Sequence, residues 1–259
     1  MNSLNRFYRQ FYLAVMDFDF YKEIVYQPFR SSLIYLLYLS AHIAIFWTAL
    51  FAWSLYPGVT QFVAWAQQNL PAIQIQEGKL HVEAEQPLVK RYKGKNETWT
   101  IVFDTTGTYL TGESLQEPSV LLTEEKLLLQ FQGMSSTYLF KDFGDGRLTP
   151  QDLPTFQKWF KWFLFPLGGY SFWLIWSFIA KALQALLLSP LVFAVSSVYG
   201  VRMSVRNSFN IALYSLAPAI VIDLAVSLTG ITISYFDWIY LGAAMIYVYL
   251  ATQKTVLGK

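Results

Sequence analysis

The sequence predicts an α-helical polytopic membrane protein with four transmembrane helices and an inserted extracytoplasmic, mostly antiparallel β domain. Apolar runs at 33–56, 159–200, 209–229 and 238–252 predict the helices, because about 20 apolar helical residues cross a hydrocarbon core ~30 Å thick. A polar block at 57–158 separates the first two runs and supplies the β domain. Hydrophobic residues make up 54% of the 259 positions, above the roughly 45–50% of a soluble domain.

The composition excludes several kinds of chemistry. The chain has no cysteine, so a disulfide framework, a thiolate metal site and a cysteine nucleophile are ruled out. The net charge is +2, and no basic block suggests nucleic acid as a partner. We expect no cofactor. The partners that we expect are the lipid bilayer and a membrane or extracytoplasmic protein.

The chain divides into eight predicted segments. They are a cytoplasmic or interfacial amphipathic segment at 1–30, transmembrane helix 1 at 31–56, the extracytoplasmic small β domain with helical exit and entry at 57–158, a long kinked transmembrane helix 2 at 159–200, a cytoplasmic loop at 201–207, transmembrane helix 3 at 208–230, transmembrane helix 4 at 236–252 and a cytoplasmic tail at 253–259. The first apolar run lacks a small-residue cleavage site, so we expect it to remain as an anchor.

The segment before the first span is apolar and aromatic. Leu4, Phe7, Phe11 and Val15 recur at spacings of three and four, which place them on one face of a helix. Two interpretations stay open. The helix packs on the membrane bundle from the cytoplasmic side, or it lies in the headgroup layer as an interfacial helix.

Lys and Arg in short loops set the orientation of membrane spans. Basic residues occupy the N-terminal segment, the loop after Gly200 and the C-terminal tail, whereas the turn at 230–237 has none. Four spans with both termini in the cytoplasm put all of these basic segments inside. The polar block at 57–158 then lies outside.

The run at 159–200 is about twice as long as one span needs. One interpretation is a single long helix, kinked near Pro190 and extending past the bilayer. The other splits the run near Lys181 into two spans, which makes five in total and moves the C-terminus outside. We favour the single helix, because the basic loop at 201–207 then stays in the cytoplasm.

Within the polar block the hydrophobic period changes from 3.6 to 2 after a short helical exit at 59–69, which predicts strands. Glu77–Gly78 and Glu124–Glu125 separate alternating runs as hairpin turns. Thr149, Pro150 and Asp152 predict the cap and first turn of a helix that leads into the second span. The six predicted strands cover 73–75, 80–84, 99–103, 120–123, 126–131 and 136–140.

Two short motifs in the polar block suggest catalysis or metal binding at first sight. Asp104-Thr-Thr-Gly107 differs from the Asp-Thr/Ser-Gly of an aspartic protease by an extra threonine and has no second copy. The stretch 145–152 matches only the back half of a calcium loop. We interpret the first as a strand end with an Asx turn and the second as a turn plus helix cap. No catalytic, cofactor-binding or metal-binding residue is assigned.

Ionisable residues inside the apolar runs indicate an intramembrane polar site. Asp223 lies within the third predicted span, and a carboxyl group in lipid usually faces the bundle and finds a partner. Lys181 and His42 are the available partners in the other runs. Asp223 either holds helices together or binds an ion or substrate.

Structural motifs are spread over nearly the whole chain: Phe7-Tyr-Arg-Gln-Phe-Tyr12, Phe20-Tyr21, Gln27-Pro28, Glu77-Gly-Lys-Leu80, Gln86-Pro87 and Ile101-Val-Phe-Asp-Thr-Thr-Gly107. They resemble a bacterial family catalogued as a domain of unknown function, numbered 1189, whose MalA-like members sit beside maltodextrin-uptake genes. Val198-Tyr-Gly200, Ser208-Phe209 and Leu213-Tyr-Ser-Leu-Ala-Pro218 are similar to the Yip-type membrane superfamily. That similarity implies a cytoplasmic 201–207 loop and a role through interaction, and it assigns no catalytic residue.

The function that we expect is that of a non-enzymatic accessory or scaffold protein in the bacterial cytoplasmic membrane. The separate β domain would meet a partner in an uptake or envelope system. The alternative is a small transporter or channel-like subunit that uses Asp223 and Lys181.

Overall fold

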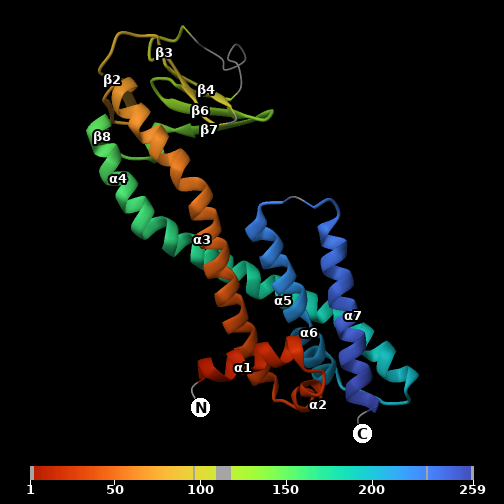
Figure 1. The fold of residues 1–259 in the computed structure, drawn as a ribbon. Helices are drawn as coiled ribbons and strands as arrows, with labels where there is room; N and C mark the ends of the chain where they lie inside the picture. The colour runs from red at the N-terminus through yellow and green to blue at the C-terminus, as the bar shows by residue number, and fades with distance from the viewer. Residues whose placement is uncertain (1–2, 96, 109–117, 232, 258–259) are drawn as a thin grey trace. The chain divides into compact units, whose positions relative to one another are not determined.

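The computed structural model describes residues 3–95, 97–108, 118–231 and 233–257 (Figure 1). The chain separates into two compact units, one formed by residues 1–51 and 166–259 and the other by residues 52–165. The long helices are α1 (Ser3–Met16), α3 (Phe29–Asn69), α5 (Phe165–Val198), α6 (Val205–Thr229) and α7 (Phe236–Leu257), with short helices α2 (Phe20–Ile24) and α4 (Leu153–Trp159). The strands are β1 (Ile73–Gln76), β2 (Lys79–Val82), β3 (Leu88–Lys93), β4 (Thr98–Phe103), β5 (Ser119–Leu122), β6 (Lys126–Phe131), β7 (Met134–Leu139) and β8 (Gly146–Leu148).

Helix α6 forms the buried centre of the helical unit. Residues 208–220 are all buried, as is typical of a helix that is apolar on every side. The Ser204 hydroxyl accepts a hydrogen bond from the backbone N–H of Asn207 and so caps the start of α6. Gly230 ends the helix in the left-handed conformation, where a residue without Cβ has no steric penalty.

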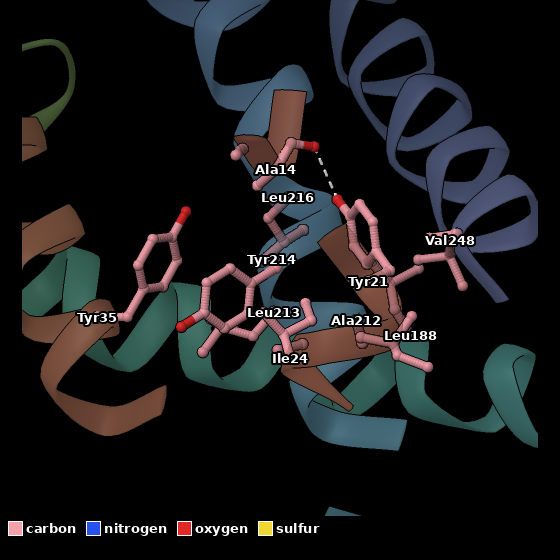
Figure 2. Close-up of a cluster of buried hydrophobic side chains, with 14 of the residues drawn as sticks. Ala14, Tyr21, Ile24, Tyr35, Leu188, Ala212, Leu213, Tyr214, Leu216 and Val248 are labelled. Carbon is pink, nitrogen blue, oxygen red and sulfur yellow. Dashed lines mark hydrogen bonds between the residues drawn. The ribbon is translucent and has the colours of Figure 1, made fainter. Parts of the chain in front are cut away.

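The N-terminal helices complete this core. Tyr21 of α2 is fully buried, and its hydroxyl donates to the backbone carbonyl of Ala14 at 2.9 Å (Figure 2). The ring of Tyr35 in α3 stacks on that of Tyr214 in α6, with ring centroids 4.0 Å apart. The first contact joins α2 to α1, and the second joins α3 to α6.

The face of α1 that is buried differs from the predicted face. Phe7, Gln10 and Ala14 are buried, whereas Leu4 is 38% exposed. Phe11 and Val15 only flank the core. These contacts support the packed interpretation of the N-terminal segment. Its opposite face exposes aromatic side chains such as Tyr12.

Three helices in the described part of the chain are long and apolar enough to cross a membrane: α3, the helix at 150–198, and α6. The chain is therefore suited to a membrane, but the predicted count of four spans is not confirmed. The fourth predicted span does form a helix, α7. The apolar stretch of α7 at 238–252 is shorter than one full span. It is bounded by Asp237 at one end and by Gln253 and Lys254 at the other.

Residues 150–198 form one continuous helical segment, not two helices. It consists of α4, a single π-helical stretch at Phe160–Leu164 and α5, preceded by a 3-10 turn at Pro150–Asp152. Pro190 lies inside α5. The predicted helical exit at 59–69 is likewise the continuation of α3, which runs on through Pro57.

The described residues of the second unit form two sheets, with strand orders β2-β1-β8 and β3-β4-β5-β6-β7. All pairs are antiparallel except β4 and β5, which are parallel. The hairpin turn at Glu77–Gly78 is confirmed, with φ values of 52° and 76°. The six predicted strands miss β3 and β8. In β3 the partly buried Lys90 interrupts the apolar alternation, and β8 has only three residues, all exposed.

The β unit has its own hydrophobic core. Leu80, Ile101, Phe103, Leu122 and Phe140 are buried together, and side chains from the last turns of α3 pack against them. The sheets therefore fold around a centre that is separate from the helical core.

Candidate functional site

Lys181 joins α5 to α7 through a group of polar side chains. Its ammonium Nζ donates to Gln184 Oε1 at 3.1 Å and to the hydroxyl of Tyr240 at 3.0 Å. The Tyr240 hydroxyl in turn donates to Gln184 Oε1 at 3.0 Å. The ammonium also lies 4.7 Å from the centroid of the Tyr240 ring, within the range of a cation–π interaction. Lys181 and Gln184 reach the same partner because residues three apart share a helix face.

Asp223 of α6 shares a cavity with this group. The cavity has a volume of about 320 Å³, and Lys181, Gln184 and Asp223 all line it. The structure thus brings together two of the three residues predicted for an intramembrane polar site.

The cavity lies near one end of the helical unit. Asp223 is about 9 Å along the axis from Thr229, the last residue of α6, and Tyr240 is in the first turns of α7. Trp47, Trp173 and Trp176 also line the cavity. Tryptophan rings therefore surround the polar groups of this cavity.

His42, the third predicted residue, lies elsewhere. Its Nε2 is 2.9 Å from the hydroxyl of Tyr8, and its Nδ1 is 2.7 Å from the carbonyl oxygen of Tyr38. Its ring stacks on Phe7 at 5.0 Å between centroids. His42 therefore links α1 to α3 and does not line the cavity that holds Asp223.

A second polar cluster, centred on Asn210, was not predicted. The Asn210 amide accepts from the Ser32 hydroxyl at 2.7 Å and donates to the backbone carbonyls of Ile24 and Gln27 at 3.2 and 3.0 Å. Asn210 and Ser32 are fully buried. An uncharged amide in a largely apolar helix is only a weak signal in the sequence, although polar side chains there commonly bond to neighbouring helices.

A larger apolar cavity adjoins the Lys181 group. It has a volume of about 610 Å³ and is lined by leucines of α5 and α6 and by residues of α7 that include Tyr240 and Asp237. Gln184 lines both cavities. Together they offer a cation, a carboxylate, an amide and a phenol next to an apolar chamber, a set that can bind a small polar group attached to an apolar body.

The two motifs of the polar block have structural roles in this fold. The Asp104 carboxylate accepts from the backbone N–H and the hydroxyl of Thr106 at 3.0 and 2.6 Å, so the predicted Asx turn is confirmed. The Asp145 carboxylate accepts from the backbone N–H of Glu77 at 2.8 Å. Both carboxylates therefore fix turns of the β unit.

Comparisons with known proteins place the chain in a family without assigning an activity to it. No curated protein and no solved structure matches it. Residues 8–252 match the family described as "Protein of unknown function (DUF1189)". Because this match spans most of the sequence, the chain belongs to the DUF1189 family of proteins of unknown function.

Proposed function

We propose that this chain is a non-enzymatic accessory or scaffold protein of the bacterial cytoplasmic membrane. The helical unit anchors it as a multi-pass protein with both termini in the cytoplasm. The β unit is presented outside to a protein partner in an uptake or envelope system. We further place the family within the Yip-type membrane superfamily, with MalA-like relatives, on the Val198-Tyr-Gly200 and Leu213–Pro218 motifs.

The observation that carries this proposal is the separate core of the β unit. Leu80, Ile101, Phe103, Leu122 and Phe140 close around one another, while the helical unit is built from helices suited to a membrane. A folded module with its own core, inserted between apolar helices, is an arrangement suited to presenting a binding surface. Large apolar side chains such as Val89 and Leu148 are 41% and 43% exposed on it.

Site-specific photocrosslinking in native membranes tests the proposal. A photoreactive amino acid replaces Val89 on β3 or Leu148 on β8 in the full-length chain, and Leu187 of α5, which is 77% exposed, serves as the control. We expect adducts with a protein of different mass from the two β-unit positions and lipid adducts from Leu187. Lipid adducts alone at all three positions would contradict the proposal.

A transporter or channel-like role is the second candidate, and the shared cavity favours it. Asp223 and Lys181 line the same space of about 320 Å³. A carboxylate and an ammonium facing one cavity can bind an ion or a zwitterionic substrate, and ionisable residues in such places often mark transport paths.

Asp223→Asn separates the two candidates. Asn keeps the ability to form hydrogen bonds but cannot ionise, so a scaffold should retain both its thermal stability in detergent and its complementation of a deletion strain. Asp142→Asn, an exposed carboxyl of the β unit, is the control. If Asp223→Asn leaves stability unchanged yet abolishes complementation, the transporter role replaces the scaffold role.

A further inference from the structure

Among the described strands, β7 is an open edge of the larger sheet. It is the last strand in the order β3-β4-β5-β6-β7, and all six of its residues are exposed. Met134 is 65% exposed and Tyr138 is 48% exposed. An edge strand presents a row of backbone N–H and C=O groups on which another strand can pair.

The register shows which backbone groups of β7 point outward. In an antiparallel pair, alternate residues exchange hydrogen bonds with the neighbouring strand. The turn closes with Phe131 opposite Met134, and the N–H of Phe140 donates to the carbonyl oxygen of Glu125 at 2.9 Å. The backbone N–H and C=O groups of the even-numbered residues of β7 therefore form hydrogen bonds with β6. The backbone groups of Ser135, Thr137 and Leu139 point away from it.

The two edges of the sheet differ in charge. Strand β3, at the other edge, carries Lys90, Arg91 and Lys93, and cations on an edge oppose pairing with another strand. Strand β7 has the sequence MSSTYL and carries no charge and no proline. The edge at β7 thus lacks charges that oppose pairing with another strand, whereas the edge at β3 has them.

We propose that β7 pairs antiparallel with β7 of a second copy of this chain, about a two-fold axis at Thr137. In this register Tyr138 lies opposite Ser136 and Leu139 lies opposite Ser135, so each large side chain meets a small one. Thr137 faces its own copy, a pairing that favours sheets. The three outward residues of each strand would exchange about six hydrogen bonds across the axis. This self-complementarity selects a second copy over an unrelated strand.

The membrane makes such a short contact effective. One pair of six-residue strands covers much less than the ~1,200 Å² of a stable interface. Two chains held in the same bilayer by their apolar helices meet at a raised effective concentration, which strengthens a weak contact. We therefore expect the dimer in membranes and its loss on dilution in detergent. This pairing goes beyond the proposed scaffold role and does not depend on the scaffold's partner.

The absence of cysteine from the chain permits a direct test. In an antiparallel hydrogen-bonded pair, opposite Cα atoms lie about 5.5 Å apart, within the ~4.4–6.8 Å that a disulfide spans. Mild oxidation of native membranes should convert full-length Thr137→Cys into a disulfide-linked species of twice the mass. Arg91→Cys, at the centre of the opposite edge strand, is the matched control and should stay monomeric.

A charge exchange tests the register itself. Thr137→Lys places two cations opposite each other and should abolish pairing, as should Thr137→Glu. Co-expressed chains, one with Ser135→Cys and Thr137→Lys and the other with Leu139→Cys and Thr137→Glu, should cross-link to each other. Monomeric Thr137→Cys in membranes, equal cross-linking of Arg91→Cys, or a product of any other mass would overturn the proposal.

Discussion

Asn210 joins three segments of the chain through one side chain. Its amide bonds to Ser32 of α3, to the last residue of α2 and to Gln27 in the link between them. A buried polar group without partners is destabilising, so its satisfied amide fixes the position of the N-terminal helices on α6.

Replacement of Asn210 should therefore loosen the helical unit. Asn210→Leu removes three hydrogen bonds, one to the Ser32 hydroxyl and one to each of the Ile24 and Gln27 carbonyls. Hydrogen bonds between membrane helices average about 0.6 kcal/mol each, which gives a loss of about 2 kcal/mol. Ser32→Ala removes one of these bonds and should cost less. Thermal unfolding in detergent measures both. Equal melting temperatures for Asn210→Leu and the unaltered chain would contradict this role.

The polar residues of the helical unit differ in how well sequence reveals them. Asp223 could be predicted to need a partner from another run, with Lys181 and His42 as the candidates, because a charge in an apolar run usually finds a partner. Gln184 and Asn210 could not, since an uncharged amide carries a smaller penalty and is tolerated singly. The cavity that Asp223 shares with Lys181 and Gln184 depends on packing that no spacing in the sequence reports.

Among the elements, the best predictions rest on turns and caps. The Glu77–Gly78 hairpin and the helix start at Thr149 follow from residues with strong local preferences. Strand β3 escaped detection because Lys90 stands at a partly buried position, where its aliphatic stem can pack while its ammonium reaches water. The parallel pairing of β4 with β5 is a long-range choice that local alternation cannot reveal.

The helix start at Thr149 should respond to acid. The Thr149 hydroxyl and backbone N–H both donate to Asp152, at 2.7 and 2.9 Å, and together they lower the pKa of that carboxyl. A lowered folded-state pKa means that this stabilisation is complete above the unfolded value of about 3.9 and is lost as the pH falls through the folded value.

Hydrogen-exchange protection of residues 150–158, corrected for intrinsic rates, measures this effect between pH 6 and pH 3. Protection should fall at the acid end in the unaltered chain. Asp152→Ala should show low protection throughout. A pH dependence that persists in Asp152→Ala would show that another group is responsible.

For the whole molecule, the separation of an apolar helical unit from a β unit could be predicted from the change of hydrophobic period alone. The number of spans could not be predicted in this way. The apolar content of α7 falls between that of a membrane span and that of a helix packed on a protein surface. Ala244, Val248 and Ala251 of α7 are buried, and the two alanines permit close approach of a neighbouring helix whether or not α7 is surrounded by lipid.

The proposed orientation rests on where the basic residues gather. The ammonium of Lys254 in α7 lies 3.5 Å from the carboxylate of Asp19 in the link between α1 and α2, so both ends of the chain share one end of the helical unit (Figure 1). Arg202 and Arg206 lie in the link before α6 and in its first turn, while the described residues of the α6–α7 link have no Lys or Arg. Basic loops stay in the cytoplasm.

Single cysteines in the cysteine-free chain test both the orientation and the span count. Val89→Cys on β3 and Ser234→Cys in the α6–α7 link should react with a membrane-impermeant maleimide in intact cells, because both lie outside in the four-span arrangement. Val205→Cys at the start of α6 and Leu257→Cys at the end of α7 should react only after permeabilisation. All four side chains are exposed and none is basic, so the substitutions leave the charge pattern intact.

Labelling of Leu257→Cys as strong as that of Val89→Cys, with Val205→Cys protected, would mean that α7 does not cross the membrane and that the protein has three spans. The opposite labelling at all four positions would show that the orientation is inverted and that the basic loops lie outside.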